Sequence, residues 1–436
     1  MSTTPLQRLK VSENKRFLVQ EDGTPFFWLG DTAWELFHKL SREEADAYLS
    51  NRAQLKFNVV QAVALAEFDG VATDSHYGRQ PLKLNADGQF DPTLPNLDGD
   101  DNYWTHVDHI VDLAASYGLY IAFLPTWGDK YHQAAFGKGP EIFNGDNARV
   151  YGRWLGERYG SRTNIIWVLG GDRSLITRNH FEVNNGLAAG LREAVGDSQL
   201  ITFHPCGNSS SSHHMHHESW LDFNMIQSGH HAQVRENYKH IKADYDKLPV
   251  KPTLDAEPAY EDHPVNFNAS NGYFDQADVR TGAYYGVFAG GFGTTYGHHS
   301  IWSMTTEPGP YFIMTWQEAL NRPGAAQMQH LRALIESHSF LDRVPDQSLI
   351  ADNFEGANYM VATRGEHFGM IYSPNGIPFR ASLGKWKADR VQASWFDPRS
   401  GEYSSICDYA NSGDVTFTPP SSGRGSDWVL VLTATE

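Results

Sequence analysis

The chain has 436 residues, which is too long for one ordinary hydrophobic core and indicates one large and one small domain. Its 35 Lys and Arg residues against 52 Asp and Glu residues give a formal net charge of -17. This charge argues against nucleic acid or an anionic membrane surface as the main partner and favours a small or neutral one. Aromatic residues make up 13% of the chain, which suits sugar stacking and is equally explained by a large core.

Two further features bear on the compartment. Cys206 and Cys407 lie far apart in the sequence, so we expect no disulfide framework. The N-terminal stretch MSTTPLQRLKVSENKRF has no apolar core of a secretion signal, and no later stretch approaches the ~20 apolar residues of a membrane span. We therefore expect a cytoplasmic protein for the chain as given, or a secreted or periplasmic one if a leader has been removed.

The first 342 residues alternate short apolar runs with helical patterns, after a predicted β-hairpin that turns at Asp22-Gly23. Strands are predicted at 26–31, 57–63, 119–127, 164–172, 200–207, 223–230, 252–257 and 293–299. Helices are predicted at 41–56, 102–117, 147–160, 181–195, 233–247, 276–290 and 318–338. Ser41 and Glu44 have the spacing of a capping box at the first of these helices. The pattern predicts a (β/α)₈ TIM barrel over residues 1–342, and the connection between the fifth and sixth strands, residues 208–222, is its least convincing helical stretch.

The pattern changes at Arg343 to short runs of alternating apolar and polar residues, such as YMVATRG and DWVLVLTAT, separated by Gly, Pro, Asn and Asp. Such runs predict a small antiparallel β-sandwich over residues 343–436. No obvious catalytic cluster falls within it.

Polar or aromatic side chains follow nearly every predicted barrel strand. The candidates at these strand ends are Asp31, Gln61, Trp127, Asp129, Asp172, Arg173, His204, Gln227, His230, Glu257 and Tyr296, with Trp302 in the last loop. A barrel used only as a scaffold could close its strands with turn residues alone. The pattern therefore predicts a substrate-binding rim.

Two carboxylates stand out by position, since Asp172 follows the fourth strand and Glu257 follows the seventh. These strands lie roughly across the mouth of a barrel, so one carboxyl can protonate a leaving group while the other attacks or activates water. That arrangement is the minimum for glycoside hydrolysis. As alternatives, Asp172 also suits the N-cap of the following helix, and Glu257 suits a structural pair with a barrel arginine.

Other rim residues have two interpretations each. Asp31 fits an N-cap as well as a hydrogen bond to a substrate hydroxyl. Trp127 and Trp302 fit sugar platforms in polar loops or ordinary core residues. Arg173 either lowers the pKa of Asp172, which would oppose an acid role, or binds a substrate carboxylate.

The histidines support a rival hypothesis, in which a metal-dependent hydrolase uses the His-rich rim. The stretch HHMHH at 213–217 joins His204, His230, His231, His298 and His299 as possible imidazole ligands. However, no H-x-H follows the first strand, and neither H-E-x-x-H nor C-x-x-C occurs. We therefore expect no metal or other cofactor in catalysis, while a structural ion in this loop stays possible.

The sequence also resembles a known family. RFLVQEDGTPFFWLGDTAWELFHKLSREEADAYLSNRAQLKFNVVQ, followed by NIIWVLGGD and PTLDAEPAYE, is similar to the apiosidase-like glycoside hydrolases, and the similarity covers nearly the whole chain. In that family a barrel precedes a small β-domain that carries a collagen-binding label. For residues 343–436 the sequence itself supports only a sandwich.

The resemblance implies a function. It assigns Asp172 as acid/base and Glu257 as nucleophile, and it implies release of terminal apiose, a branched pentose, from plant cell wall glycans or glycosides. The carbohydrate is then the partner, and another pentoside remains a possible substrate. Because the Asp172 side chain is one methylene shorter than a glutamate, a wider gap between the carboxyls would favour inversion, and retention stays a hypothesis.

Overall fold

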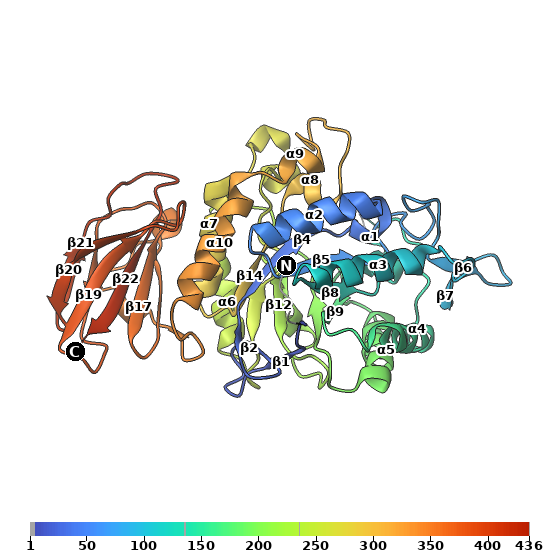
Figure 1. Cartoon of the computed structure of the whole chain (residues 1–436), viewed down its shortest axis with the longest axis horizontal. Coiled ribbons are helices and arrows are strands. Elements are labelled where there is room, and N and C mark those ends of the chain that lie inside the picture. The colour runs from blue at the N-terminus through green and yellow to red at the C-terminus, as the bar shows by residue number, and fades with distance from the viewer. Residues whose placement is uncertain (1–4, 135–136, 235, 436) are drawn as a thin grey trace.

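The computed structural model describes residues 5–134, 137–234 and 236–435. Residues 1–4 of the predicted barrel domain, residue 235 of the predicted helix 233–247 and residue 436 of the predicted sandwich therefore lie outside the described part. A barrel with surrounding helices stands beside a C-terminal antiparallel sheet domain, which packs next to α7 (Gln276–Phe288) and α10 (Pro323–Glu336) (Figure 1). Both parts agree with the predicted fold class.

Eight parallel strands form the barrel, and each coincides with a predicted strand. They are β4 (Trp28–Thr32), β5 (Val59–Val63), β8 (Tyr120–Leu124), β9 (Ile165–Gly170), β10 (Ile201–His204), β12 (Asn224–Gln227), β13 (Thr253–Asp255) and β14 (Gly293–Tyr296). The sheet runs in the order β10-β9-β8-β5-β4-β14-β13-β12, and β11 (Ser209–Ser210) adds to it antiparallel to β12. Thr202 Oγ1 donates to Phe223 O at 2.6 Å across the gap between β10 and β12, so the barrel is nearly closed.

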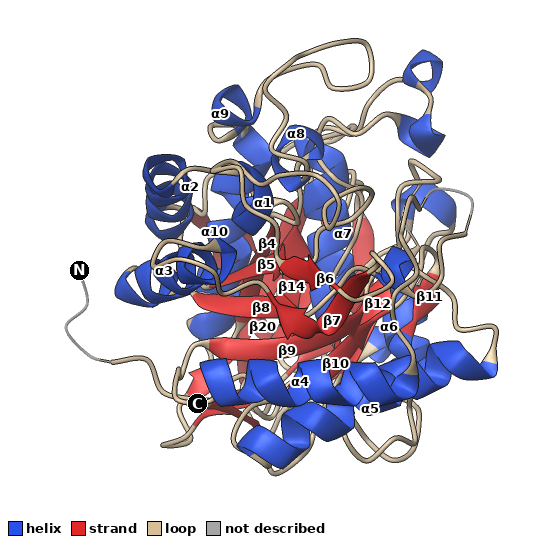
Figure 2. Ribbon diagram, turned by 90° about the vertical axis from the view of Figure 1, so that its right-hand side faces the viewer, coloured by secondary structure: helices blue, strands red, loops and turns tan. Residues whose placement is uncertain are grey.

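Helices surround the barrel (Figure 2). Besides α7 and α10, the ring contains α2 (Arg42–Gln54), α3 (Tyr103–Ser116), α4 (Gly145–Tyr159), α5 (Arg178–Val195) and α6 (Asn237–Tyr245). The predicted capping box begins α2, since Glu44 N donates to Ser41 Oγ at 3.1 Å and Ser41 N donates to Glu44 Oε2 at 2.9 Å. The weak connection at 208–222 contains β11 and a 3₁₀ turn (Ser211–His213) in place of an α-helix.

Short elements complete the barrel domain. The predicted hairpin is present as β2 (Leu18–Gln20) and β3 (Pro25–Phe26), and β1 (Leu9–Val11) extends it to three strands. At the mouth of the barrel lie the ribbon β6 (Leu82–Leu84) and β7 (Phe90–Pro95) and the short helices α1 (Leu36–Lys39), α8 (His299–Trp302) and α9 (Trp316–Ala319).

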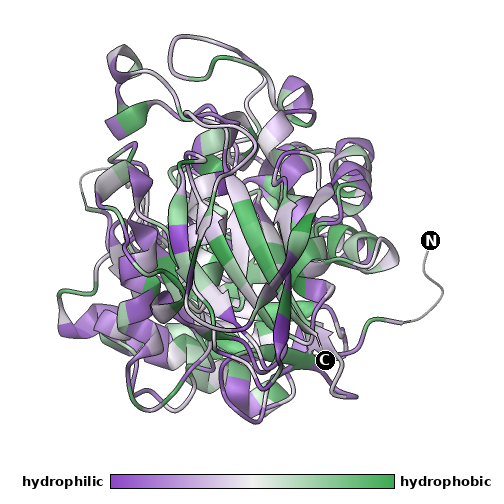
Figure 3. Ribbon diagram, turned by 90° about the vertical axis from the view of Figure 1, so that its left-hand side faces the viewer, coloured by the Kyte–Doolittle hydropathy of each residue, from purple (hydrophilic) through white to green (hydrophobic). Residues whose placement is uncertain are grey.

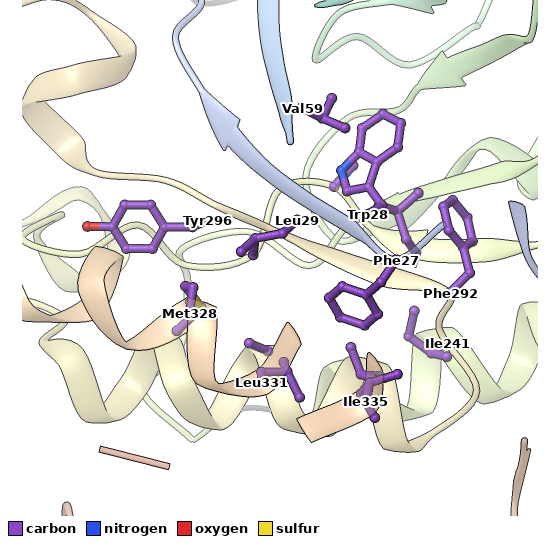
Figure 4. Close-up of a cluster of buried hydrophobic side chains, with 14 of the residues drawn as sticks. Phe27, Trp28, Leu29, Val59, Ile241, Phe292, Tyr296, Met328, Leu331 and Ile335 are labelled. Atoms are coloured by element: carbon purple, nitrogen blue, oxygen red, sulfur yellow. The ribbon is translucent and has the colours of Figure 1, made fainter. Parts of the chain in front are cut away.

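Apolar side chains fill the end of the barrel away from the rim. The Trp28 ring contacts the rings of Phe223 and Phe292 edge to face, at centroid distances of 6.0 and 6.2 Å. Leu331 and Ile335 of α10 belong to the same buried cluster (Figure 4). Since this end is packed with hydrocarbon, the polar chemistry is concentrated at the C-terminal ends of the strands.

The C-terminal domain is built from antiparallel strands. A six-stranded sheet combines β15 (Val344–Pro345), β16 (Val361–Arg364), β17 (Phe368–Ser373), β22 (Trp428–Thr435), β19 (Arg390–Phe396) and β20 (Tyr403–Ala410), and β18 (Phe379–Ser382) pairs with β21 (Asp414–Phe417). Hydrophobic and hydrophilic residues are interspersed over its outer face (Figure 3).

The two domains share a buried interface. Arg280 of α7 forms a buried ion pair with Asp427, with Nη2 2.5 Å from Oδ1. The Tyr284 ring stacks on Tyr372 of the sheet domain at 4.9 Å. Arg343, at the predicted boundary, donates to the backbone oxygens of Val287 and Gly291 at 2.6 Å each. These buried contacts join the two domains closely.

Candidate active site

Strand β9 ends in two glycines that the local packing requires. A Cβ on Gly170 would lie 2.3 Å from His204 O, and one on Gly171 would lie 2.9 Å from the Trp127 ring. Both glycines have positive φ angles, 90° and 109°, which other residues adopt only with strain. Asp172 follows with φ 52°, in a left-handed conformation that Asp tolerates better than most residues. The turn therefore carries the Asp172 carboxyl out of the barrel wall.

The Asp172 side chain lies in the cleft with 36% of its surface exposed. Burial of the carboxyl raises its pKa to about 6, and the negative charge of Glu257 adds to this rise. Arg173, whose Nη1 is 3.3 Å from Asp172 Oδ2, and the neighbours His204 and Gln227 lower the pKa in smaller measure. Of the two interpretations of Arg173, the structure supports the contact with Asp172, but its effect is outweighed.

Glu257 follows β13 and is almost fully buried between two imidazoles. His204 Nε2 lies 3.0 Å from Glu257 Oε2, and His230 Nε2 lies 3.2 Å from Glu257 Oε1. The backbone N–H of Tyr260 points to His230 Nδ1 at 3.4 Å, which leaves Nε2 of His230 as the atom that donates to Glu257. Burial alone would raise the pKa of Glu257, but the hydrogen bonds from His204 and His230 lower it to about 2.

The environments of the two carboxyls push their pKa values in opposite directions. These opposite shifts favour a protonated Asp172 beside an ionised Glu257 in mild acid. A neutral carboxylic acid beside a carboxylate is the arrangement with which enzymes pair a general acid and a nucleophile or base. The N-cap interpretation of Asp172 is wrong, because α5 begins at Arg178 with Thr177 as its N-cap.

Aromatic and amide side chains lie around the two carboxyls. The Trp127 ring is nearly buried and contacts the rings of Trp34 and His204 at 5.1 and 6.0 Å. Gln61 Nε2 donates to the backbone oxygen of Ala256 at 3.0 Å, beside Glu257. Trp127, Gln61, Gln227 and His204 each have a buried polar atom without a hydrogen-bond partner in the described part of the chain, as a site for a polyhydroxylated ligand requires.

Asp31 and Tyr296 do not join this cleft. Asp31 is fully buried and accepts hydrogen bonds from Tyr48 Oη and Arg52 Nε of α2, both at 2.6 Å. Tyr296 donates to Glu261 Oε2 at 2.6 Å and lies against Met328 of α10 (Figure 4). Because Asp31 has two partners on α2 and Tyr296 has one in the loop after β13, we correct both predicted substrate contacts to structural roles, although Asp31 Oδ1 has no hydrogen-bond partner among the described residues. Asp31 is not an N-cap either, since it lies within β4.

Asp129 is likewise used by its own loop. Its Oδ1 lies 2.7 Å from Lys130 Nζ, and both side chains are fully buried. Oδ2 accepts long hydrogen bonds of 3.4 Å from the backbone N–H groups of Lys138 and Gly139. We correct the predicted substrate contact of Asp129 to an anchor for the loop after β8.

Trp302 ends the short helix α8 at the mouth, and its ring lies 6.2 Å from that of His299. Its side chain is partly buried, and Nε1 donates to His299 Nδ1 at 3.2 Å. This position leaves the platform interpretation open.

The His-rich loop does not assemble a metal site. His213 Nδ1 lies 2.8 Å from Ser209 Oγ, whereas the two nitrogens of His216 face Asn224 Oδ1 and Pro249 O. In the ranges that the structure describes, no three His, Cys, Asp or Glu side chains are placed to hold a metal ion. The metal-dependent hypothesis therefore has no ligand set in these ranges.

Three residues near the carboxyls, Trp34, Tyr260 and Glu67, were not among the predicted contacts, and neither was Glu35, whose charge acts on Glu67. Trp34 contacts Trp127, and the buried hydroxyl of Tyr260 lies beside Glu257, while burial raises the pKa of Tyr260 well above its usual value. Burial and the charges of Glu35, Asp172, Asp129 and Glu257 raise the pKa of Glu67 well above its ordinary range. Burial also raises the pKa of Glu35 to about 7. Glu67 lies four residues after the end of β5, and this position after a strand is the sequence feature that could have indicated a place in the site.

A TIM barrel with an acid and an ionised carboxylate at the ends of its fourth and seventh strands has the architecture of a glycoside hydrolase. The comparisons with known proteins agree. Residues 12–342 match the family model described as "Apiosidase-like, catalytic domain", so the chain belongs to the apiosidase-like family and is a glycosidase. Residues 344–433 match a model described as "Putative collagen-binding domain of a collagenase".

Solved structures give the same class. A glycoside hydrolase family 5 protein from Bacteroides vulgatus is 33% identical with a TM-score of 0.88, covering 98% of this chain and 93% of its own. A second structure, titled a glycoside hydrolase, is 33% identical with a TM-score of 0.86 and coverages of 98% and 97%. Another glycoside hydrolase structure from Bacteroides vulgatus, 13% identical with a TM-score of 0.72 and coverages of 100% and 84%, shares the fold. No curated protein matches the chain.

The class implies a carbohydrate substrate. Within the described ranges, no helix has both the length and the apolar character needed to cross a membrane.

Proposed function

We propose that this glycosidase releases terminal apiose from plant glycans or glycosides, with Asp172 as acid/base and Glu257 as nucleophile. The observation that carries the roles is the opposite displacement of the two pKa values, to about 6 for Asp172 and about 2 for Glu257. The choice of apiose is supported by membership of the apiosidase-like family.

The first half of the reaction forms a covalent intermediate. Asp172 donates its proton to the glycosidic oxygen as the bond to the anomeric carbon breaks, while a Glu257 oxygen forms a bond to that carbon. His230 and His204 hold the Glu257 carboxylate in place and ionised before the attack. The negative charge of Glu257 also stabilises the positive charge that develops on the sugar ring in the oxocarbenium-like transition state.

The second half uses the coupling between the carboxyls. Once Glu257 is esterified, its negative charge no longer raises the pKa of Asp172, so Asp172, which has just given up its proton, stays ionised and can accept one from an incoming water. The water adds to the anomeric carbon, Asp172 takes its proton, and the bond to Glu257 breaks. The sugar leaves with retained configuration, and the enzyme returns to its starting protonation.

A substrate screen tests the proposal. Apiosides and matched arabinofuranosides with the same aglycone are incubated with the enzyme, and released sugar is identified by chromatography. We expect apiose to be released at the higher kcat/KM. Exclusive release of arabinose would assign the enzyme to another pentoside and contradict the apiose proposal.

Proton NMR of the first-formed sugar tests the stereochemistry separately. We expect the anomer with the configuration of the substrate. Initial appearance of the opposite anomer would make Glu257 a general base and end the retaining mechanism.

A further inference from the structure

Two exposed aromatic rings lie near Glu257, in the loops that follow β13 and α8. Phe267 has 50% of its surface exposed, and Tyr311 has 39% exposed. Neither ring contacts a catalytic carboxyl directly. A large exposed aromatic side chain beside a polar cleft is typical of a surface that contacts a ligand.

A continuous series of rings connects Phe267 to the nucleophile. His230, which contacts Glu257, is stacked by His263 at a centroid distance of 4.2 Å and an interplanar angle of 20°. The Phe267 ring then meets His263 edge to face at 4.9 Å and His230 at 5.8 Å. Phe267 is therefore held one ring beyond the imidazole that touches Glu257.

Tyr311 is supported by the same cluster. Its ring lies 4.6 Å from His299 and 6.2 Å from His263, so His263 contacts both exposed rings. Tyr273 Oη donates to Pro310 O at 2.7 Å, which ties the loop of Tyr311 to the loop of Phe267. The two rings thus form one supported surface, here called the aromatic wall.

The backbone beneath Phe267 provides an independent observation. Asn266 and Phe267 both have positive φ angles, 52° and 59°, and Asn266 N donates to His230 O at 2.9 Å. Consecutive non-glycine residues in this region are strained, and such strain concentrates at ligand-binding sites. The strained turn therefore fixes the position of the Phe267 ring, although half of this residue is exposed and burial alone does not hold it in place.

The released sugar is bound between Asp172 and Glu257, so the rest of the glycoside must extend outward from the cleft. We infer that the aromatic wall binds the leaving-group sugar, a pyranose whose apolar C–H face stacks on Phe267 and Tyr311. This inference rests on the proposed function, because it assigns a place to the part of the same glycoside that is not released as pentose.

The test compares two leaving groups. Kinetics are measured with methyl apioside and with an apiosyl disaccharide whose second sugar is a pyranose, for the wild type and the variants Phe267→Ala and Tyr311→Ala. We expect each variant to lose about tenfold in kcat/KM on the disaccharide, mainly through KM, with a several times smaller loss on the methyl glycoside. Tyr403→Ala, which truncates a 50% exposed aromatic residue of β20 in the C-terminal sheet domain, should change the kinetics on neither substrate.

Other outcomes separate the two proposals. Equal losses on both substrates, or no loss on the disaccharide, would overturn the aromatic wall, and Phe267→Leu repeats the test if Phe267→Ala does not fold. The comparison is repeated with methyl and pyranosyl arabinofuranosides, so that failure with apiose alone removes only the proposed substrate. Binding of the apiosyl disaccharide is also measured by calorimetry in the Glu257→Gln variant, with and without Phe267→Ala, so that no turnover occurs. Weaker binding with Phe267→Ala supports the aromatic wall, and unchanged binding contradicts it.

Discussion

Asp31 and Glu257 are both buried carboxylates at the rim of the same barrel, yet their neighbours give them different roles. Asp31 lies between the guanidinium of Arg52 and the hydroxyl of Tyr48, so its charge is balanced. Glu257 lies between two imidazoles and faces Asp172 rather than a permanent cation. The side facing α2 therefore forms a structural cluster, and the side of β9, β10, β12 and β13 holds the two carboxyls to which we assign proton transfer and attack.

Glu257→Gln should have the largest effect. Removing the nucleophile should lower kcat by about four orders of magnitude, because the amide cannot form the glycosyl ester. The fold should stay intact, since the amide still accepts from His204 or His230. Steady-state kinetics with thermal unfolding checks both points, and more than a tenth of wild-type turnover would contradict the role of Glu257.

Asp172→Asn should have the second largest effect on turnover, and the size of this effect should depend on the leaving group. Asn tolerates the left-handed backbone of this position, so the variant tests the proton and not the turn. We expect kcat/KM on a sugar glycoside, which reports the first half of the reaction, to fall by about three orders of magnitude. The kcat/KM on an activated aryl glycoside, which needs little protonation, should fall much less, and equal losses on both would argue against Asp172 as the acid.

Asp31→Asn should act on stability and leave the chemistry intact. Because Arg52 would keep a buried charge without its partner, we expect the free energy of unfolding to fall by about 3 kcal/mol. Asp98→Asn, which breaks an exposed pair with Lys83, serves as the matched control and should cost less than about 1 kcal/mol. A large loss of kcat in folded Asp31→Asn protein would place Asp31 in the substrate site after all.

Arg173→Gln should produce the smallest change, a shift in pH dependence. Arg173 lowers the pKa of Asp172, so its removal should raise that pKa and move the alkaline limb of kcat/KM to higher pH. Arg173→Lys keeps the charge and should move the limb less. A shift to lower pH would show that Arg173 does not act on Asp172 electrostatically.

The sequence was most informative where a local pattern decides the structure. Eight apolar runs became the eight barrel strands, and the capping box at Ser41 and the Asp22-Gly23 turn lie where their residue types predict. The connection with the poorest helical pattern, 208–222, contains no α-helix in the structure. Strand and helix periodicity is a short-range property and can be seen in one sequence.

The site was predictable only in part, because position along a strand does not reveal the partner of a side chain. Three predicted contacts lie near strand ends, as Glu257 does, but each is bound by another side chain that the strand pattern does not single out. These pairs are Asp31 with Arg52, Asp129 with Lys130 and Tyr296 with Glu261. Glu67 was missed for the same reason, since only the folded cleft brings it near Asp172 and Glu257.

The pH profile of wild-type kcat/KM tests the division of roles most directly. The proposed mechanism needs a protonated Asp172 and an ionised Glu257, so activity should persist in mild acid and fall as the pH rises through about 6, the pKa of Asp172. The fall should disappear in Asp172→Asn on an activated aryl glycoside. A wild-type profile that stays flat to pH 8, or one that rises through pH 6, would contradict Asp172 as the proton donor.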